Sequence, residues 1–173
     1  LAVPLLGSCI EINTPKADII CDAGVFFFAN QEFVDVLAPK KEWQPRVDYP
    51  ILTAKHYHCL LSHGHTDHYA GLFALNPNTS VDAYAGDLTW RIFNETATLL
   101  AIKAKGNFVY PNIRHVGTFE HAKPFWIEDC QITPLRISHN IPDCWAFIIE
   151  CHNIRLLYAP EFTDRFWLKE QEM

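Results

Sequence analysis

The stretch CLLSHGHTDHYAGL, residues 59–72, places four metal-coordinating side chains directly behind an apolar run. They are His63, His65, Asp67 and His68. The preceding KHYHCLLS (residues 55–62) is typical of a strand that becomes apolar, and HYAGLFALN (residues 68–76) has apolar residues at helical spacing with NPN as a stop signal. The cluster is therefore predicted to lie on a loop between a strand and a helix.

Imidazole and carboxylate groups are ligands for divalent cations, and a loop at the carboxyl end of a strand can turn several of them towards one point. A single His near an Asp is typical of a surface hydrogen bond. The spacing H-x-H-x-D-H within six residues instead favours metal binding, and the number of ligands suits two adjacent ions.

The remaining pattern predicts an α/β fold, with strands and helices alternating early and strands dominating late. CIEIN (9–13) and ADIICDAG (17–24) form a predicted hairpin with TPK as its turn. Residues 25–50 are expected to be a long surface loop with one short helix, and residues 86–106 a helix that ends at Gly106. Further strands are expected at 80–85, 113–117, 124–138, 144–151 and 154–160.

Composition limits the classes of protein to consider. With 173 residues, 49% hydrophobic and 20% charged, the chain is expected to form a single domain over residues 1–173. No apolar run approaches the roughly 18 residues of a membrane span, so no membrane partner is expected. The formal net charge of −6 and the scattered Lys and Arg residues lack the basic footprint of a protein that follows a long nucleic acid.

The six cysteines contain no C-x-x-C pair, and several lie inside apolar runs. Buried free thiols are therefore expected rather than a disulfide framework, which favours a reducing compartment and a cytoplasmic protein. Cys59 adjoins the His-rich cluster but belongs to the apolar run CLL, so we expect an inert core residue rather than a nucleophile.

The segment SHGHTDHYAGL (62–72) resembles the signature of the metallo-β-lactamase superfamily. IICDAGVFF (19–27), RISHNIPD (136–143) and LLYAPEFTD (156–164) stand where that superfamily has its other site segments. Within it the chain is most similar to ribonuclease J and its β-CASP relatives, because HNIPDC (139–144) resembles their H-S-I-P-D-S. The resemblance implies an αβ/βα sandwich with helices on the outside. It covers only about the first half of such an enzyme, so an incomplete fold is expected.

The resemblance also implies a set of site residues. His63, His65 and His139 would hold one divalent metal, and Asp67 and His68 a second. The carboxylate of Glu161 would lie between the two ions. Asp22 would hold the His-rich loop by hydrogen bonds without coordinating. Zinc is the expected metal, with manganese as the alternative.

The chemistry such ligands permit is hydrolysis. A water molecule shared by two divalent ions is acidified from a pKa of about 15.7 towards about 7, which gives a hydroxide nucleophile at neutral pH. The ions also offset the charge that develops on the attacked oxygen. Asp67 is the expected catalytic residue, because it can orient that hydroxide.

The chain departs from the family in two ways. It reads Pro160-Glu161-Phe162 where relatives have an Asp in a Gly-Asp-Phe setting, and the additional methylene is expected to shift the bridging oxygen. The sequence also stops before a β-CASP module and before the final metal-binding His of relatives. The remaining histidines are expected to be surface or turn residues, namely His115, His121 and His152.

Three functions therefore stay open. The first is a metal-dependent RNA phosphodiesterase of the ribonuclease J type, and the second a non-catalytic domain that binds metal or a partner. The third is a hydrolase of a small ester, thioester or cyclic phosphodiester. An incomplete fold would expose apolar edge surface, which predicts a homo-oligomer or a partner chain that completes the fold.

Overall fold

The computed structural model describes residues 8–24, 54–103 and 111–161. The expected loop and short helix at 25–50 and the helix end at Gly106 lie outside these ranges. All other predicted strands and helices can be compared with the structure.

The first sheet has the strand order β1-β2-β3-β4-β5. Its strands are β1 (Ile10–Asn13), β2 (Asp18–Cys21), β3 (His56–Leu61), β4 (Ser80–Ala85) and β5 (Asn112–Gly117). β1 and β2 form the predicted antiparallel hairpin, and β2 to β5 are parallel to one another. Their carboxyl ends therefore meet at one edge of the sheet.

The second sheet is antiparallel and has the order β6-β7-β8-β9. Its strands are β6 (Phe125–Ile127), β7 (Cys130–Ile137), β8 (Cys144–Cys151) and β9 (Ile154–Tyr158). The strand expected over residues 124–138 is thus a hairpin. It turns at Glu128, whose backbone has a positive φ of 51°.

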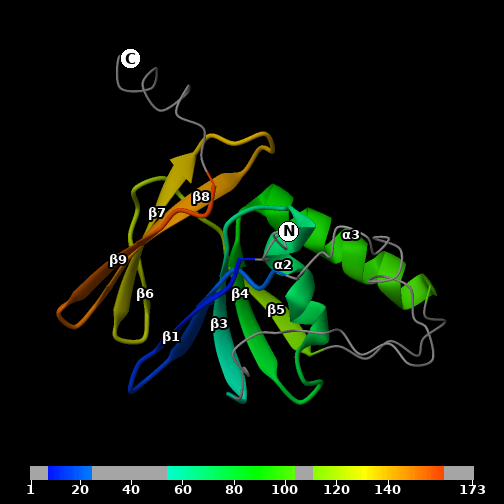
Figure 1. The fold of residues 1–173 in the computed structure, drawn as a ribbon, viewed down its shortest axis with the longest axis horizontal. Helices are drawn as coiled ribbons and strands as arrows, with labels where there is room; N and C mark the ends of the chain where they lie inside the picture. Colours follow the sequence, from blue (N-terminus) through cyan, green and yellow to red (C-terminus); the bar gives the residue numbers. More distant parts are fainter. Residues whose placement is uncertain (1–7, 25–53, 104–110, 162–173) are drawn as a thin grey trace, which may run out of the picture.

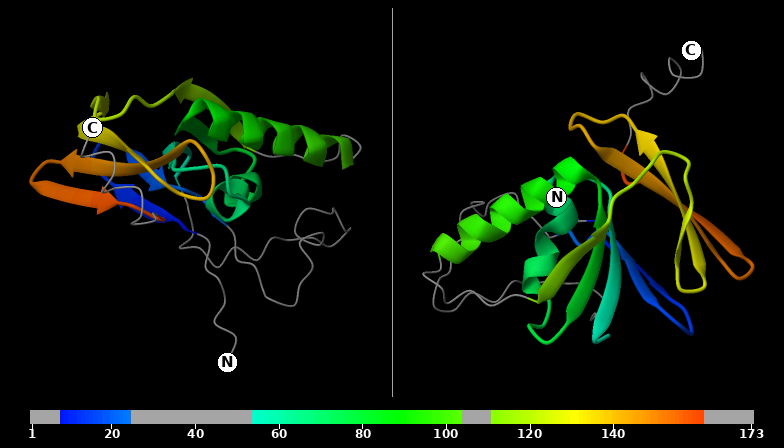
Figure 2. Two further views of the ribbon diagram at one scale, coloured as in Figure 1. Left: turned by 90° about the horizontal axis from the view of Figure 1, so that it is seen from above. Right: turned by 180° about the vertical axis from the view of Figure 1, so that it is seen from behind.

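Helices cover one face of the first sheet, and the second sheet faces the other (Figures 1 and 2). α3 spans Asp87–Lys103. The helix predicted at 68–76 begins earlier, as the short α2 (Thr66–Tyr69), and continues as the 3₁₀ helix η1 (Ala70–Ala74). The expected α/β sandwich, incomplete in its second half, is confirmed: two sheets face each other and helices cover the outside of the first.

Alternating side chains build a core on each face of the first sheet. Along β3, Tyr57, Cys59 and Leu61 pack under the helices, while Leu60 points to the second sheet. Phe93 of α3 joins the helix-side core. The core between the sheets is filled from β2, β7 and β8, chiefly by Ile19, Ile132, Phe147 and Ile149.

The outer face of the second sheet carries large apolar side chains that are open to solvent. Trp126 is 63% exposed and Leu157 is 60% exposed. The strand register places both on the face turned away from the core. Association with a partner through such a surface stays a prediction.

The expectation of free thiols rather than disulfides is wrong for two of the six cysteines. Cys130 and Cys151 form a disulfide, because the register of β7 and β8 places them directly opposite each other with their Cα atoms 4.4 Å apart. The thiols that remain free are those of Cys9, Cys21, Cys59 and Cys144. The disulfide removes the argument from free thiols for a reducing compartment. Within the described ranges, no helix has the length and apolar character needed to cross a membrane.

Candidate metal centre

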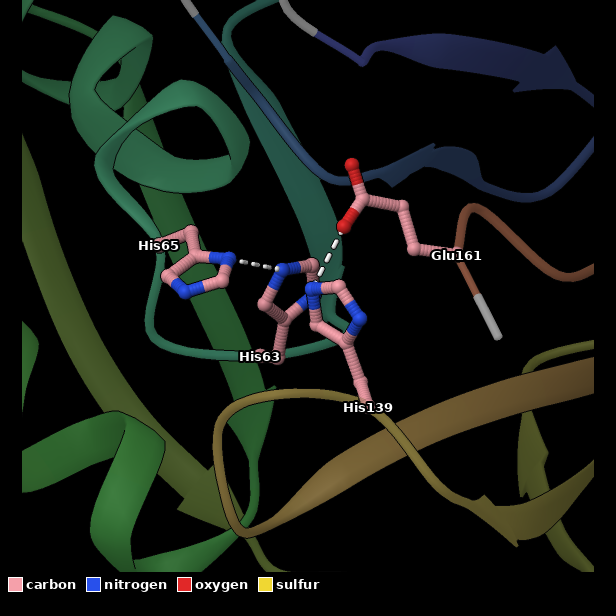
Figure 3. Close-up of side chains that lie close together, drawn as sticks. All are labelled: His63, His65, His139 and Glu161. Atoms are coloured by element: carbon pink, nitrogen blue, oxygen red, sulfur yellow. Dashed lines mark hydrogen bonds and ion pairs between the residues drawn. The ribbon is translucent and has the colours of Figure 1, made fainter. Parts of the chain in front are cut away.

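The candidate ligands and the Asp22 carboxylate that supports them meet where four strands end. Asp22 follows β2, His63 follows β3 after one residue, and His139 lies just beyond β7. Glu161 lies beyond β9. Both sheets therefore deliver side chains to one edge of the sandwich, and Figure 3 shows His63, His65, His139 and Glu161 pointing towards one another.

The first ligand group consists of His63, His65, His139 and Glu161. One donor atom from each lies within 4.8 Å of the others. Nε2 of His63 is 3.0 Å from Nδ1 of His65, and Nε2 of His139 is 2.5 Å from Oε2 of Glu161. The ring of His139 lies 5.1 Å from each of the other two imidazoles. These are the residues that the resemblance assigns to one metal, with Glu161 added.

The second ligand group consists of Asp67, His68 and Glu161. Nε2 of His68 is 3.7 Å from Oδ2 of Asp67 and 3.8 Å from Oε1 of Glu161. Glu161 therefore presents one oxygen to each group. The ring centres of His63 and His68 are only 4.0 Å apart, so the two groups are adjacent.

Asp22 is fully buried and holds the His-rich loop from below. Its carboxylate accepts hydrogen bonds from the backbone N–H of Ser62 at 2.7 Å and from the Ser62 hydroxyl at 2.6 Å. It also accepts bonds from Nδ1 of His68 and from the hydroxyl of Tyr158, each at 2.7 Å. Because Nδ1 of His68 donates to Asp22, its Nε2 is left as the acceptor that faces the second group.

The same network fixes the tautomer of His63. The single hydroxyl proton of Ser62 is donated to Asp22, so Ser62 Oγ accepts a proton from Nδ1 of His63, 2.9 Å away. Nε2 of His63 then carries the lone pair and points into the first group. Asp22 thus orients two histidines, one directly and one through Ser62.

The pKa values of these two neighbouring rings move in opposite directions. Burial, together with the charges of His68, His65 and His139, lowers the pKa of His63 to about 3. Burial alone would lower the pKa of His68, but its hydrogen bond to Asp22 and the charges of Asp22, Asp67 and Glu161 raise it. His63 is therefore a neutral ring at physiological pH.

The donor set fits divalent cations. Imidazole nitrogens and carboxylate oxygens converge, and Ser62 and Asp22 satisfy the ring nitrogens of His63 and His68 that point away. Nε2 of His139 is buried, and its contact with Glu161 lacks the geometry of a hydrogen bond. A cation would satisfy this buried nitrogen, which has no hydrogen-bond partner among the described residues. The number and identity of bound metals stay predictions.

The turn after β2 is locked to the His-rich loop by backbone contacts. Ala23 donates to the carbonyl of His68 at 2.7 Å and accepts from the N–H of Gly71 at 2.7 Å. A Cβ at Gly24 would lie 1.6 Å from the carbonyl oxygen of Asp67, so only glycine permits this approach. This close backbone approach fixes the position of Asp22 relative to the candidate ligands.

The loop that carries His139 is fixed by Asp143. Oδ2 of Asp143 accepts the backbone N–H of Thr89 in the first turn of α3 at 2.9 Å, and Oδ1 accepts Nε1 of Trp145 at 2.8 Å. The backbone N–H of Trp145 in turn donates to the carbonyl of Ser62 at 2.9 Å. The two sheets are thereby joined beside the ligands. The sequence interpretation assigned no role to Ser62, Tyr158 or Asp143.

The expectation of surface or turn positions is confirmed for His121 and His152 and is wrong for His115, which is a half-buried residue within β5. His115 stacks on Trp90, His121 accepts the backbone N–H of Arg136, and His152 pairs with Asp129. Cys59 is fully buried, and burial raises the pKa of its thiol well above the ordinary value. It does not supply a nucleophile.

Comparison with known proteins agrees with this geometry. Residues 18–166 match the family described as "Beta-lactamase superfamily domain". Zn²⁺-bound PqqB from Methylobacterium extorquens is similar with a TM-score of 0.57 and 15% identity, over 94% of this chain and 56% of that one. YhfI from Bacillus subtilis, a metallo-β-lactamase fold protein, is similar with a TM-score of 0.56 and 17% identity, over 92% of this chain and 57% of that one. A protein of unknown function from Enterococcus faecalis V583 is similar with a TM-score of 0.55 and 21% identity, over 90% of this chain and 40% of that one.

The chain thus spans between 40 and 57% of the length of these three structures. Members of the matched superfamily bind divalent metals and are mostly metal-dependent hydrolases. The family match covers most of the sequence, and the strand ends carry that superfamily's ligand types. The chain therefore belongs to the metallo-β-lactamase superfamily.

Proposed function

We propose that this chain is the metal-binding part of a phosphodiesterase that uses two divalent cations, zinc or alternatively manganese, to cut single-stranded RNA. The observation that carries the proposal is the placement of the Glu161 carboxylate, which faces His139 with one oxygen and His68 with the other. A carboxylate shared in this way supplies negative charge to two cations at once.

Each ligand group has a distinct composition. His63, His65 and His139 would hold one cation through three neutral nitrogens, while Asp67 and His68 would hold the other through one oxygen and one nitrogen. When bound, such a pair of cations lowers the pKa of a water molecule from about 15.7 to about 7 and offsets charge on the attacked oxygen. Asp22 keeps Nε2 of His68 turned towards the second group.

Asp67 is the residue best placed to handle a proton. Its side chain is 41% exposed, whereas that of His68 is 1% exposed. The Asp67 carboxylate can therefore meet a substrate or a water molecule from the open side of the site and accept a proton there. No other nucleophile is needed, because the thiol nearest in sequence, Cys59, is fully buried.

RNA is proposed as the substrate because HNIPDC (139–144) resembles the corresponding segment of ribonuclease J. This segment carries His139 and also Asp143, which attaches the loop to α3. Two adjacent cations also suit a phosphodiester, because they can offset the negative charge on its oxygens. The net charge of −6 is a counterargument, since it opposes the approach of a long polyanion.

The test compares two substrates on the metal-loaded protein. One is a single-stranded RNA with a 5′-monophosphate, and the other is bis-(4-nitrophenyl) phosphate. We expect both to be cleaved, and we expect His65→Ala to abolish both reactions while His121→Ala retains them. His121 is the matched control because it is an exposed histidine outside the ligand groups.

Two results would contradict the proposal. Cleavage of the small phosphodiester alone would show a small-molecule hydrolase. Stoichiometric metal binding without cleavage of either substrate would show a non-catalytic metal-binding domain.

A further inference from the structure

A second cluster of metal-binding side chains lies at the opposite end of β3. His56 and His58 are two residues apart on this strand, so both point to the same face, while Tyr57 between them is buried in the core under the helices. The parallel register places Asp82 of β4 directly beside His58. His58 precedes His63 by five residues, which is about 16 Å along an extended chain. The cluster is thus separate from the metal centre.

The donor atoms of this cluster lie close together. One ring nitrogen each from His56 and His58 and one carboxylate oxygen from Asp82 fall within 4.8 Å of one another. The two rings meet edge to face with centres 4.9 Å apart, and Nε2 of His56 is 3.7 Å from Oδ2 of Asp82. Nδ1 of His58 is shielded from solvent and has no hydrogen-bond partner within the part of the chain that the structure describes. A buried ring nitrogen without a partner is costly unless something binds it.

The tautomer of His56 is fixed by its neighbour across the strand. Ser80 Oγ donates to the carbonyl of Lys55 and therefore accepts a proton from Nδ1 of His56, 2.8 Å away. Nε2 of His56 then carries the lone pair, and this is the nitrogen that lies near Asp82. Ser62 and His63 show the same arrangement in the metal centre.

Arg114 of β5 fixes the carboxylate. Its Nε donates to Oδ1 of Asp82 at 2.5 Å, and its terminal nitrogen donates to Oδ2 at 2.9 Å. A carboxylate offers about four lone-pair positions, so about two remain after both bonds to Arg114. Arg114 itself is 68% exposed, so solvent screens its charge. The pair holds Asp82 in place without using up its capacity to bind a cation.

We propose that His56, His58 and Asp82 form a second divalent-cation site, of the class that binds Zn²⁺ with two imidazoles and one carboxylate. Zinc takes such donors at about 2.0–2.2 Å, which places them about 3.3 Å apart in tetrahedral geometry. The donor atoms now lie up to 4.8 Å apart, so side-chain rotation on ion binding would have to bring them closer. The side chain of His56 is 43% exposed, so this ring has room to rotate and leaves space for water as a fourth ligand. The ion would join β3 to β4 at the end of the sheet away from the metal centre.

The site predicts a measurable metal stoichiometry. The probe is Zn²⁺ alone, dialysed against the apo protein at micromolar free concentration and counted by mass spectrometry of the metal. We expect His56→Ala and His58→Ala each to bind one equivalent fewer than wild type. His152→Ala is the matched control, because His152 is an exposed histidine that also pairs with a carboxylate, that of Asp129 at 3.1 Å. It should bind as many equivalents as wild type.

A second background separates this site from the metal centre. In a variant with His65→Ala, Asp67→Ala, His139→Ala and Glu161→Ala, which removes ligands from both groups of the metal centre, we expect one equivalent of Zn²⁺ to remain and His56→Ala to remove it. Zn²⁺ should also raise the melting temperature of this background, and no longer do so after His56→Ala, since an ion that binds only the folded state stabilises it. Because His56 is exposed, His56→Ala should not lose Zn²⁺ by unfolding. Circular dichroism of the variant checks that the fold is retained.

The proposal is overturned if His56→Ala binds as much Zn²⁺ as wild type, or if the background variant binds none. Neither outcome depends on catalysis, so the proposed phosphodiesterase activity and this site can fail independently.

Discussion

The carboxylate of Glu161 lies between two histidines from different sheets, with Oε2 2.5 Å from Nε2 of His139 and Oε1 3.8 Å from Nε2 of His68. His139 follows a strand of the second sheet, and His68 lies on α2 above the first. Glu161 thus faces both ligand groups, and its side chain is 40% exposed. A cation in either group would draw on its negative charge.

Replacing Glu161 separates its charge from its length. Glu161→Gln removes the negative charge and should weaken binding of the second Zn²⁺ by on the order of tenfold or more. Glu161→Asp keeps the charge and withdraws the carboxylate from its close contact with His139, so this variant should bind at least as tightly as wild type. Calorimetric titration of the three apo proteins with Zn²⁺ measures both effects. Superimposable titrations would show that Glu161 is not a ligand.

The histidines of the His-rich loop should be indispensable for metal binding. His63→Ala removes a neutral nitrogen from the first group, and His65→Ala removes its neighbour 3.0 Å away. We expect either variant to lose at least one equivalent of Zn²⁺. His121→Ala should keep the wild-type content, because His121 is an exposed residue that accepts the backbone N–H of Arg136 and belongs to neither ligand group. Elemental analysis after dialysis decides between the variants, and metal loss in His121→Ala with retention in His63→Ala would contradict the assignment.

Tyr158 should act on the metal centre through Asp22. Burial raises the pKa of Tyr158, so its hydroxyl stays protonated and donates to the Asp22 carboxylate at 2.7 Å. Tyr158→Phe removes one of the donors that neutralise this buried charge and should cost about 1–3 kcal/mol of unfolding free energy. It should also weaken metal binding by about 10- to 100-fold, as loss of a group behind a ligand does.

Tyr57→Phe is the control for this effect. Tyr57 is equally buried, but its hydroxyl accepts the backbone N–H of Ala54, far along β3 from the ligands. Its loss should lower stability in urea unfolding and leave the Zn²⁺ affinity of the metal centre unchanged. Equal effects of both variants on Zn²⁺ affinity would show that Tyr158 matters only for the fold.

The site was predictable from sequence where its residues are neighbours in the chain. His63, His65, Asp67 and His68 lie within one loop, so their spacing alone indicates a metal centre. His139 and Glu161 came from resemblance, because no local pattern links them to that loop. Tyr158 was missed since its partner Asp22 is 136 residues away, and only the packing of the two sheets brings them together.

The fold, too, was predictable only where neighbouring residues determine the structure. The hairpin of β1 and β2, the β3 strand and the α3 helix follow from local patterns, and they lie where those patterns predict. The 3₁₀ continuation after Tyr69 and the turn at Glu128 depend on tertiary packing and on a positive φ, neither of which periodicity reports. The cysteine pairing depends on strand register and was likewise out of reach.

The remaining free thiols should react slowly in the folded protein. Burial, with the charge of Asp22, raises the pKa of Cys144 to about 12, and the same causes with Glu11 raise that of Cys9 to about 12. At pH 8 the reactive thiolate is then roughly 1,000-fold scarcer than for an ordinary cysteine. Iodoacetamide labelling followed by peptide mass analysis should modify both residues only after unfolding. Rapid labelling of Cys144 in the native protein would contradict its burial.

The disulfide should stabilise the protein by lowering the conformational entropy of the unfolded chain. Cys130 and Cys151 are 21 residues apart, and closing a loop of that length removes unfolded-state entropy equivalent to about 3 kcal/mol. We expect the double variant Cys130→Ala, Cys151→Ala to lose about that much unfolding free energy in urea without loss of Zn²⁺ binding, because both residues lie at the end of β7 and β8 remote from His139. Peptide mapping without reductant should recover the two cysteines as one linked fragment. Recovery of six alkylated cysteines from the purified protein, with equal stability of the double variant, would show that the pair stays reduced.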